Sequence, residues 1–144
     1  MCSISDLRLV SPQALRQWFE RRSPSGNGRF AVVDVRDRDY IGGHIKGCYH
    51  YPADQFEDFL PELNDKLKEA EVNDVVFHCM LSQLRGPKSA LQFLRFLNNI
   101  TEPQEKERLQ GLHVWVLKGG FSRWALFYGE DPRVTEDYAI DLWT

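Results

Sequence analysis

The segment from 78 to 87, His-Cys-Met-Leu-Ser-Gln-Leu-Arg-Gly-Pro, contains a cysteine and an arginine whose types and spacing suit chemistry on a tetrahedral oxyanion. The thiolate form of Cys79 would be a strong nucleophile, and the planar guanidinium of Arg85 could bind two oxygens of one anion. Residues 80–84 separate the two side chains, and this length of chain can surround a phosphate-sized group. The segment therefore predicts nucleophilic attack by Cys79 on a phosphoryl or arsenyl group, with Arg85 as the anion clamp.

The elements around this segment would position the two side chains. The apolar run 75–77 predicts a buried strand that ends just before Cys79, and the apolar residues between 91 and 97 predict a helix that begins after Arg85. A strand that turns tightly into a helix directs several backbone N–H groups at one point, beside the positive end of the helix dipole. This field should favour the thiolate at neutral pH.

The loop itself supplies the expected anion site. Its backbone N–H groups and the arginine side chain would bind the phosphoryl oxygens, so the expected substrate-binding residues are Met80, Leu81, Ser82, Gln83, Leu84 and Arg85. The Ser82 hydroxyl could donate to the thiolate or to the leaving oxygen, and Gly86 would let the backbone approach closely. We expect Met80 and Leu84 to rim a shallow mouth and Leu81 to anchor the loop to the core.

A purely structural explanation of Cys79 is also open. A cysteine behind an apolar strand is often a small buried hydrophobe, and a cysteine and an arginine six positions apart occur by chance in many chains. His78 could orient the loop by a hydrogen bond or be a buried structural histidine. The succession of strand, loop, Gly86-Pro87 and helix favours the chemical interpretation.

Strands alternate with helices along the rest of the chain. The predicted strands cover 7–10, 30–35, 48–51, 75–77 and 113–117. The first predicted helix has Ser11 as its N-cap and Pro12 in its first turn, the second has Asp54 as its N-cap, the third follows Pro87, and the last covers 121–128. Residues 101–110 are interpreted as a solvated connection, and residues 129–144 as a tail that folds back on the domain. Because parallel strands need helical crossovers, this order predicts one α/β domain over residues 1–144 with a mainly parallel sheet.

Two aspartates should lie at the same edge of the sheet as the cysteine loop. Ligands of α/β sheets gather at the carboxyl ends of the strands, and Asp37 and Asp39 follow the predicted strand 30–35. Either carboxyl could be the general acid that protonates a leaving group, although solvated loop carboxylates are the commoner outcome.

Composition and charge narrow the functional classes. The 144 residues are 42% hydrophobic and 27% charged, with a formal net charge of -3, which gives no bias toward nucleic acid. No run approaches the ~18 apolar residues of a membrane span, and the first residues lack a signal-peptide pattern. The odd number of cysteines, Cys2, Cys48 and Cys79, fits free thiols in a reducing compartment. We expect a cytoplasmic or nuclear protein with neither a membrane nor a nucleic acid as partner.

A metal site is not predicted. His44, Cys48 and His50 have a spacing that could suggest one, but only three ligands are visible and Cys48 is expected to point into the core.

Two further stretches identify a family resemblance. Val32 to Arg36, followed by Tyr40 to Gly47, resembles the first rhodanese signature, and Leu117 to Trp124 resembles the second. The resemblance covers roughly residues 7 to 128. It implies a rhodanese-like three-layer fold, with a mainly parallel five-stranded sheet flanked by helices.

Within that superfamily, the length of the cysteine loop points to one branch. Loops with five residues between Cys and Arg are similar to those of M-phase inducer phosphatases and eukaryotic arsenate reductases, whereas sulfurtransferase loops have four residues after the cysteine. His78-Cys79, Ser82 and Arg85-Gly86-Pro87 match the phosphatase-like branch, and the small size resembles the single-domain fungal phosphatases.

The resemblance implies a monomeric cysteine-dependent phosphatase without a cofactor. It would hydrolyse phosphate monoesters, of the phosphotyrosine or aryl type, through a phosphocysteine intermediate, and its partner would be a phosphorylated protein, a phosphorylated small molecule or an oxyanion. A glutathione-dependent arsenate reductase is the alternative. A thiosulfate sulfurtransferase and a non-catalytic phosphate-binding module are less favoured, because of the loop length and the intact Cys79, Ser82 and Arg85.

Two departures from the inducer phosphatases affect the expected mechanism. Leu84 stands where they carry a glutamate that is often proposed as the general acid, and Val35 stands where they carry a second cysteine. The source of the leaving-group proton is therefore open, with Asp37 and Asp39 as candidates. A reversible intramolecular disulfide is not expected.

Overall fold

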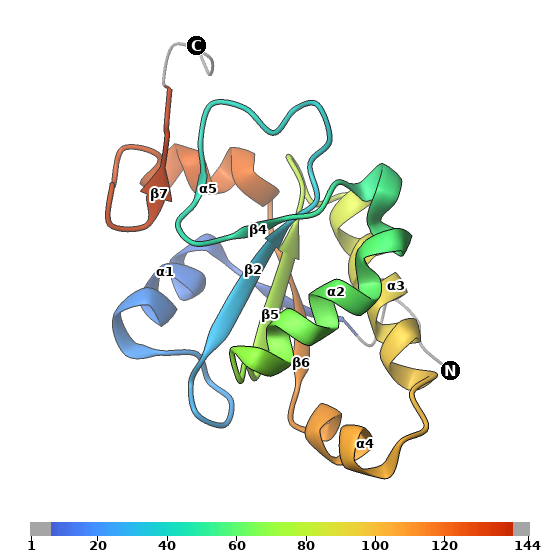
Figure 1. The fold of residues 1–144 in the computed structure, drawn as a ribbon. Helices are drawn as coiled ribbons and strands as arrows, with labels where there is room; N and C mark the ends of the chain where they lie inside the picture. Colours follow the sequence, from blue (N-terminus) through green and yellow to red (C-terminus); the bar gives the residue numbers. More distant parts are fainter. Residues whose placement is uncertain (1–6, 140–144) are drawn as a thin grey trace.

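A five-stranded parallel sheet forms the centre of the structure, a computed structural model that describes residues 7–139 (Figure 1). The strand order is β1-β6-β5-β2-β4, and each neighbouring pair is parallel. The strands are β1 (Arg8–Val10), β2 (Phe30–Asp34), β4 (Tyr49–His50), β5 (Asp74–His78) and β6 (His113–Leu117). This arrangement confirms the predicted α/β fold with a mainly parallel sheet.

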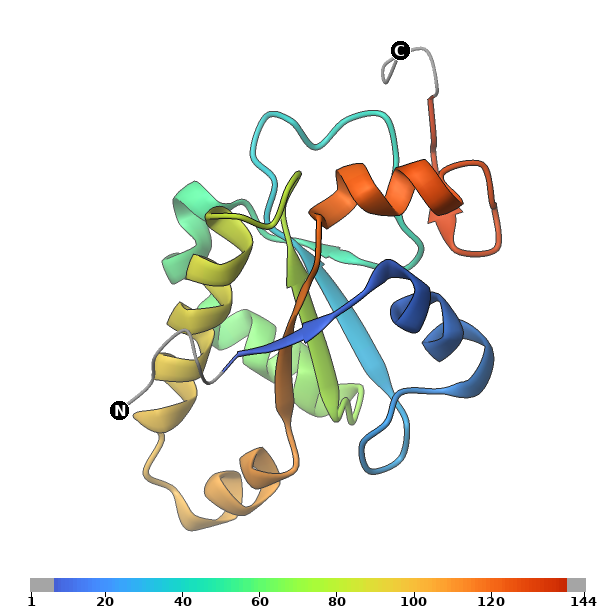
Figure 2. The ribbon, with the colours of Figure 1, turned by 180° about the vertical axis from the view of Figure 1, so that it is seen from behind.

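Helices cover both faces of the sheet and make it the middle of three layers (Figures 1 and 2). On one face, α2 (Phe56–Glu69) and α3 (Arg85–Asn98) enclose a core that includes Phe77, and on the other, α1 (Pro12–Arg21) and α5 (Gly120–Tyr128) enclose a core that includes Val76. Side chains alternate along a strand, so β5 feeds both cores, and all of its residues are buried. The strand that carries the cysteine loop is therefore fixed from both sides.

Local sequence signals explain where several helices begin. The Ser11 hydroxyl accepts a hydrogen bond from the Ala14 N–H at 3.0 Å and caps α1, whose first residue is a proline, as predicted. The expected cap at Asp54 is wrong, because this residue lies inside a short 3-10 helix, η2 (Ala53–Gln55). Pro61 lies inside α2 without dividing it.

The segment interpreted as a solvated connection contains a helix instead, α4 (Pro103–Gln110). None of its residues is buried, so the hydrophobic pattern gave no helical signal. Ion pairs and hydrogen bonds hold it: Glu105 pairs with Lys68, and Arg108 donates to the Asn64 side chain at 2.8 Å. Proline in the first turn also favours the helix.

The C-terminal segment folds back as predicted, within the residues that are described. A short strand, β7 (Thr135–Glu136), pairs antiparallel with β3 (His44–Ile45), and the Trp124 indole N–H donates to the Thr135 hydroxyl at 2.9 Å. Residues 140–144 of the predicted tail and Cys2 lie outside the described residues.

The loops that carry chemistry leave the sheet at one end. The segment after β2, residues 35–43, and the segment after β5, residues 79–84, lie side by side at the carboxyl ends of these strands (Figures 1 and 2). The Val35 N–H donates to the His78 carbonyl at 2.9 Å, so the two strand ends are joined where the loops begin. The helix α4 lies at the opposite end of the sheet.

Candidate active site

Cys79 lies at the bottom of a loop whose backbone points toward its sulfur. The side chain follows directly after β5 and is 3% exposed. Its Sγ accepts hydrogen bonds from the N–H groups of Ser82, at 3.1 Å, and Gly86, at 3.4 Å. These donors come from the middle of the loop and from the first turn of α3, where N–H groups have no intrahelical partner. The arrangement stabilises negative charge on the sulfur.

Two backbone features give the loop this shape. Ser82 adopts a left-handed conformation with φ +56°, which turns the chain back over the cysteine. A Cβ at Gly86 would lie 3.3 Å from the Cys79 nitrogen and 3.3 Å from the His78 Cα, so a side chain there would press on the cysteine. The Ser82 Oγ is buried and has no hydrogen-bond partner among residues 7–139, so it is available to an anion in the loop.

The N-terminus of α5 holds the cysteine loop by backbone hydrogen bonds. The Phe121 N–H donates to the Cys79 carbonyl and the Ser122 N–H donates to the Met80 carbonyl, both at 2.9 Å. Gly120 has φ +60°, and a Cβ there would lie 2.5 Å from the Met80 carbonyl oxygen. From the sequence alone, Gly119-Gly120 predicts only a turn after the strand 113–117. Nothing in the sequence around Gly120 indicates that the cysteine loop, about 40 residues earlier in the chain, packs against this residue.

Arg85 pairs with the two aspartates that follow β2. Its Nη1 lies 2.8 Å from Asp39 Oδ1 and 3.2 Å from Asp37 Oδ2, and its Nη2 lies 2.6 Å from Asp39 Oδ2. Hydrogen bonding to Arg85 lowers the pKa of the Asp39 carboxyl, and the same bonds raise the pKa of the guanidinium. The structure thus brings Asp37, Asp39 and Arg85 together at one edge.

The pairing leaves part of the guanidinium available. Arginine has five N–H donors, and the two aspartates engage both donors of Nη1 and one of Nη2. The Nε donor and the second Nη2 donor of Arg85 have no partner among the described residues. These two donors form one edge of the plane, which suits two oxygens of a phosphoryl group.

A buried ion pair lies behind both loops. The Arg36 Nη2 lies 2.7 Å from Asp34 Oδ2, both side chains are fully buried, and Arg36 also donates from Nη2 to the Gly43 carbonyl at 2.8 Å. Burial would raise the pKa of the Asp34 carboxyl, but His78 and the Arg36 contacts outweigh it and lower the pKa. A charged pair in the core is costly unless it is well hydrogen-bonded, and this one is.

His78 connects this pair to the cysteine. Its Nδ1 lies 3.0 Å from the Cys79 carbonyl oxygen, which can only accept, so Nδ1 carries the proton. Its Nε2 lies 3.7 Å from Asp34 Oδ2, beyond hydrogen-bond length. Burial lowers the pKa of His78, so the ring is neutral at neutral pH. His78 therefore holds the cysteine carbonyl from inside the core.

Exposed apolar side chains surround the mouth of the loop. Leu84 is 72% exposed, as expected for a residue at the rim, but Leu81 is 51% exposed and does not anchor the loop to the core. The backbone hydrogen bonds from α5 anchor the loop instead. The side chains of Leu81 and Leu84 point outward because the N–H groups of the loop point inward.

The three residues considered for a metal have other partners. The His50 Nε2 lies 2.6 Å from the Arg36 carbonyl oxygen, and the His44 Nε2 lies 3.5 Å from Glu136 Oε1. Burial raises the pKa of the Cys48 thiol to about 12, so it stays protonated. Among residues 7–139, no group of three or more His, Cys, Asp or Glu side chains is placed to hold a metal ion. No described helix has the length and apolarity needed to cross a membrane.

A family model of the rhodanese-like domain matches residues 11–126 of the chain. The chain belongs to the rhodanese-like family. The match includes four of the five strands of the sheet, β2, β4, β5 and β6, with both signature stretches and the cysteine loop, and a rhodanese-like fold accounts for the strand order described above.

Relatives within the rhodanese-like family carry two kinds of name. The chain is 40% identical over 150 residues to the CDC25-like phosphatase YCH1 of Saccharomyces cerevisiae, a match that covers 98% of this chain and 97% of that protein. It is 41% identical over 99 residues to Arsenate reductase 2.2 of Oryza sativa subsp. japonica, which covers 68% of this chain and 71% of the relative.

A solved rhodanese structure has the same architecture. It is described as Ygr203w, a yeast protein tyrosine phosphatase of the rhodanese family, and it superimposes with a TM-score of 0.85 at 40% identity. The match covers 99% of this chain and 100% of the yeast chain. Both the fold and the family branch implied by the sequence resemblance are therefore confirmed.

Proposed function

We propose that this chain is a cysteine-dependent phosphatase that hydrolyses phosphate monoesters of the phosphotyrosine or aryl type. The observation that carries the proposal is the Cys79 sulfur, which accepts hydrogen bonds from the backbone N–H groups of Ser82 and Gly86. Arg85 lies at the far end of the same loop. The phosphatase names of two relatives that match over nearly their whole length support it.

In the first step, the Cys79 thiolate attacks phosphorus. An S–P bond forms while the bond from phosphorus to the ester oxygen breaks, and the leaving oxygen takes a proton from water. The loop N–H groups of residues 80–84 and the free edge of Arg85 bind the non-bridging oxygens, where charge gathers in the transition state. The unpaired Ser82 hydroxyl can donate to the sulfur or to the leaving oxygen.

In the second step, water attacks the phosphocysteine. The S–P bond breaks, and inorganic phosphate and the Cys79 thiolate are released. Sulfur is a good leaving group here because the Ser82 and Gly86 N–H groups stabilise its charge.

The source of the proton for the leaving group follows from the pairing of the aspartates. Asp39 is held ionised by Arg85, and an ionised carboxylate cannot donate a proton. Asp37 touches the same guanidinium, and Leu84 has no proton to give. We infer that the resting site holds no positioned protein acid, so substrates with good leaving groups are favoured.

Arsenate reduction is the second candidate, and the similarity to the rice arsenate reductase favours it. Arsenate has nearly the geometry of phosphate and would occupy the same loop. Cys79 would attack arsenic with loss of water, and one glutathione thiolate would attack the Cys79 sulfur, so that arsenic takes two electrons and leaves as arsenite. A second glutathione would then reduce the mixed disulfide and release the enzyme thiol.

One set of assays separates these functions. The purified protein should hydrolyse an aryl phosphate such as 4-nitrophenyl phosphate, and Cys79→Ser should abolish turnover, because the hydroxyl of serine is a far weaker nucleophile here. Glutathione-dependent arsenite formation, measured on the same preparation, gives the competing rate. Thiocyanate formation from thiosulfate and cyanide without aryl phosphate hydrolysis would contradict the proposal.

A further inference from the structure

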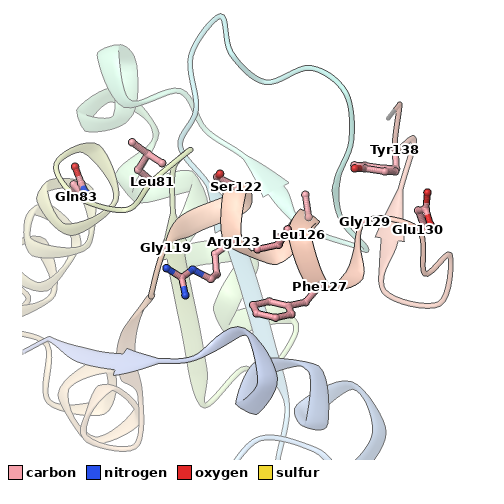
Figure 3. A pocket seen from close by; sticks show the side chains of 11 residues that line it. Leu81, Gln83, Gly119, Ser122, Arg123, Leu126, Phe127, Gly129, Glu130 and Tyr138 are labelled. Carbon is pink, nitrogen blue, oxygen red and sulfur yellow. The ribbon is translucent and has the colours of Figure 1, made fainter. Parts of the chain in front are cut away.

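An open groove of about 860 Å³ runs from the cysteine loop along α5 to the C-terminal segment (Figure 3). Its walls come from the loop and from one side of the helix, and its main lining residues are Leu81, Gln83, Ser122, Arg123, Leu126 and Phe127. Volumes of this size are typical of ligand sites. The groove therefore begins at the loop that surrounds the proposed reaction centre.

Exposed apolar side chains are concentrated in this groove. Three of the large apolar residues that are exposed in the described part of the chain line it: Leu81 at 51%, Leu126 at 76% and Phe127 at 49%. Leu84, at 72%, belongs to the same loop. Apolar side chains that gather on a polar surface mark a binding surface more often than apolar side chains scattered singly.

The polar groups of the groove are unengaged. The guanidinium of Arg123 has no ion pair or hydrogen bond to any described residue, and the side chains of Gln83 and Ser122 likewise have no partner within residues 7–139. Glu130 lines the far end. One cation beside apolar side chains and neutral amide and hydroxyl groups does not suit a polyanion, which needs a cluster of cations.

We propose that this groove binds the polypeptide segment next to the phosphorylated residue of a protein substrate, with an apolar side chain of the segment on Leu126 and an acidic one on Arg123. The proposal rests on the phosphatase function and names its substrate class as phosphoproteins. Leu81 and Gln83 belong to the loop and line one end of the groove, so the groove offers a path for a chain that is attached to a phosphoryl group in the loop. Gln83 and Ser122 can bind its backbone. Arsenate fills only the loop and gains nothing from the groove.

Charge reversal gives the sharpest test. Two phosphotyrosine peptides would be compared, one with glutamate and leucine on both sides of the phosphotyrosine, and the other with lysine in place of each glutamate. The wild type should prefer the glutamate peptide in kcat/KM. Arg123→Glu should lower that preference about three- to tenfold or reverse it, as expected for one partly exposed ion pair turned into a repulsion. Arg95→Glu, an exposed reversal on α3 outside the groove, should leave the preference unchanged.

The apolar contact has its own matched pair of variants. Leu126→Ser should lower kcat/KM for the leucine-containing peptide, whereas Leu9→Ser, which removes another exposed leucine from β1 outside the groove, should not. Neither variant should change the hydrolysis of 4-nitrophenyl phosphate, because an aryl phosphate of that size stays within the loop. Thermal unfolding of each variant shows whether it is folded.

The outcomes separate this proposal from the phosphatase function on which it rests. Normal aryl phosphate hydrolysis, with the same peptide preference in wild type, Arg123→Glu and Leu126→Ser, would overturn the groove and leave the phosphatase function intact. Binding of both peptides to Cys79→Ser would be measured by fluorescence polarisation. If this binding depends on Arg123 but the wild type does not hydrolyse aryl phosphate, the groove is supported and the phosphatase function is contradicted.

Discussion

The Asp39 carboxylate engages Arg85 with both of its oxygens, at 2.8 and 2.6 Å, and so orders the proposed anion clamp before any substrate arrives. Asp39 is itself held in place by two further hydrogen bonds. Its Oδ1 accepts the Asp37 N–H at 3.0 Å, and its carbonyl accepts a hydrogen bond from the buried Arg36 at 3.4 Å. A free arginine side chain loses about 2 kcal/mol of rotamer entropy when it is fixed, and this pairing removes part of that cost from substrate binding.

Replacement of Asp39 should therefore weaken the clamp. Asp39→Asn loses the charge-assisted two-point contact, and we expect kcat/KM for an aryl phosphate to fall about ten- to hundredfold, as for a misplaced catalytic group. Asp37→Asn, which removes only a contact of 3.2 Å, should have a smaller effect. The inhibition constant of inorganic phosphate measures the clamp directly. Tighter phosphate binding in Asp39→Asn would show that Asp39 competes with the anion and does not position Arg85.

The leaving group should control the rate. General acid catalysis contributes about 10²- to 10⁴-fold and matters most for poor leaving groups. We expect wild type to prefer aryl over alkyl phosphates, and Leu84→Glu to accelerate alkyl substrates more than aryl ones. Rates for a series of leaving groups in wild type, Leu84→Glu, Asp37→Asn and Asp39→Asn test this. If the series is flat in wild type and becomes steep in one aspartate variant, that aspartate is the acid.

The contact between α5 and the cysteine loop predicts an intolerant glycine. Gly120→Ala places a Cβ 2.5 Å from the Met80 carbonyl oxygen in a left-handed backbone, so both stability and aryl phosphate hydrolysis should decrease strongly. Gly47→Ala is the matched control, because φ there is +74° but nothing lies within 4 Å of the new methyl group. It should cost about 1–2 kcal/mol, the intrinsic strain of that conformation, and leave activity unchanged. Equal effects of the two substitutions on activity would argue against the contact.

Burial of a neutral histidine predicts a dependence of stability on pH. The pKa of His78 in the folded state lies below its ordinary value of 6.5, so the unfolded chain binds more protons there. The full stability is present above pH 6.5 and is lost progressively as the pH falls toward the lowered value, by at most about 1.4 kcal/mol per pH unit for one group. Urea unfolding of wild type and His78→Gln over this window tests it. The same slope in both proteins would assign the effect to another group.

Local sequence signals predicted much of this fold but not the contacts that complete the site. The strand 113–117 and the Ser11 cap follow from patterns within a few residues, and the structure has both. Asp37 and Asp39 could be placed at the edge of the sheet because parallel strands end together. Their pairing with Arg85 could not be predicted, because it joins positions 46 and 48 residues apart and depends on the path of two loops. The polar helix α4 was not predicted, because it has no apolar stripe and is held by ion pairs instead.

The outward direction of the loop side chains separates two tasks in this protein. The reacting phosphoryl group would be held by backbone atoms of the loop and by Arg85, which Asp39 fixes in place, whereas Leu81 and Gln83 face the solvent and the groove. Substitutions at these outward positions can change which molecules enter without altering the atoms that perform the reaction. A scaffold built in this way can acquire new substrates in evolution through single surface changes, and proteins of similar sequence include both phosphatases and arsenate reductases.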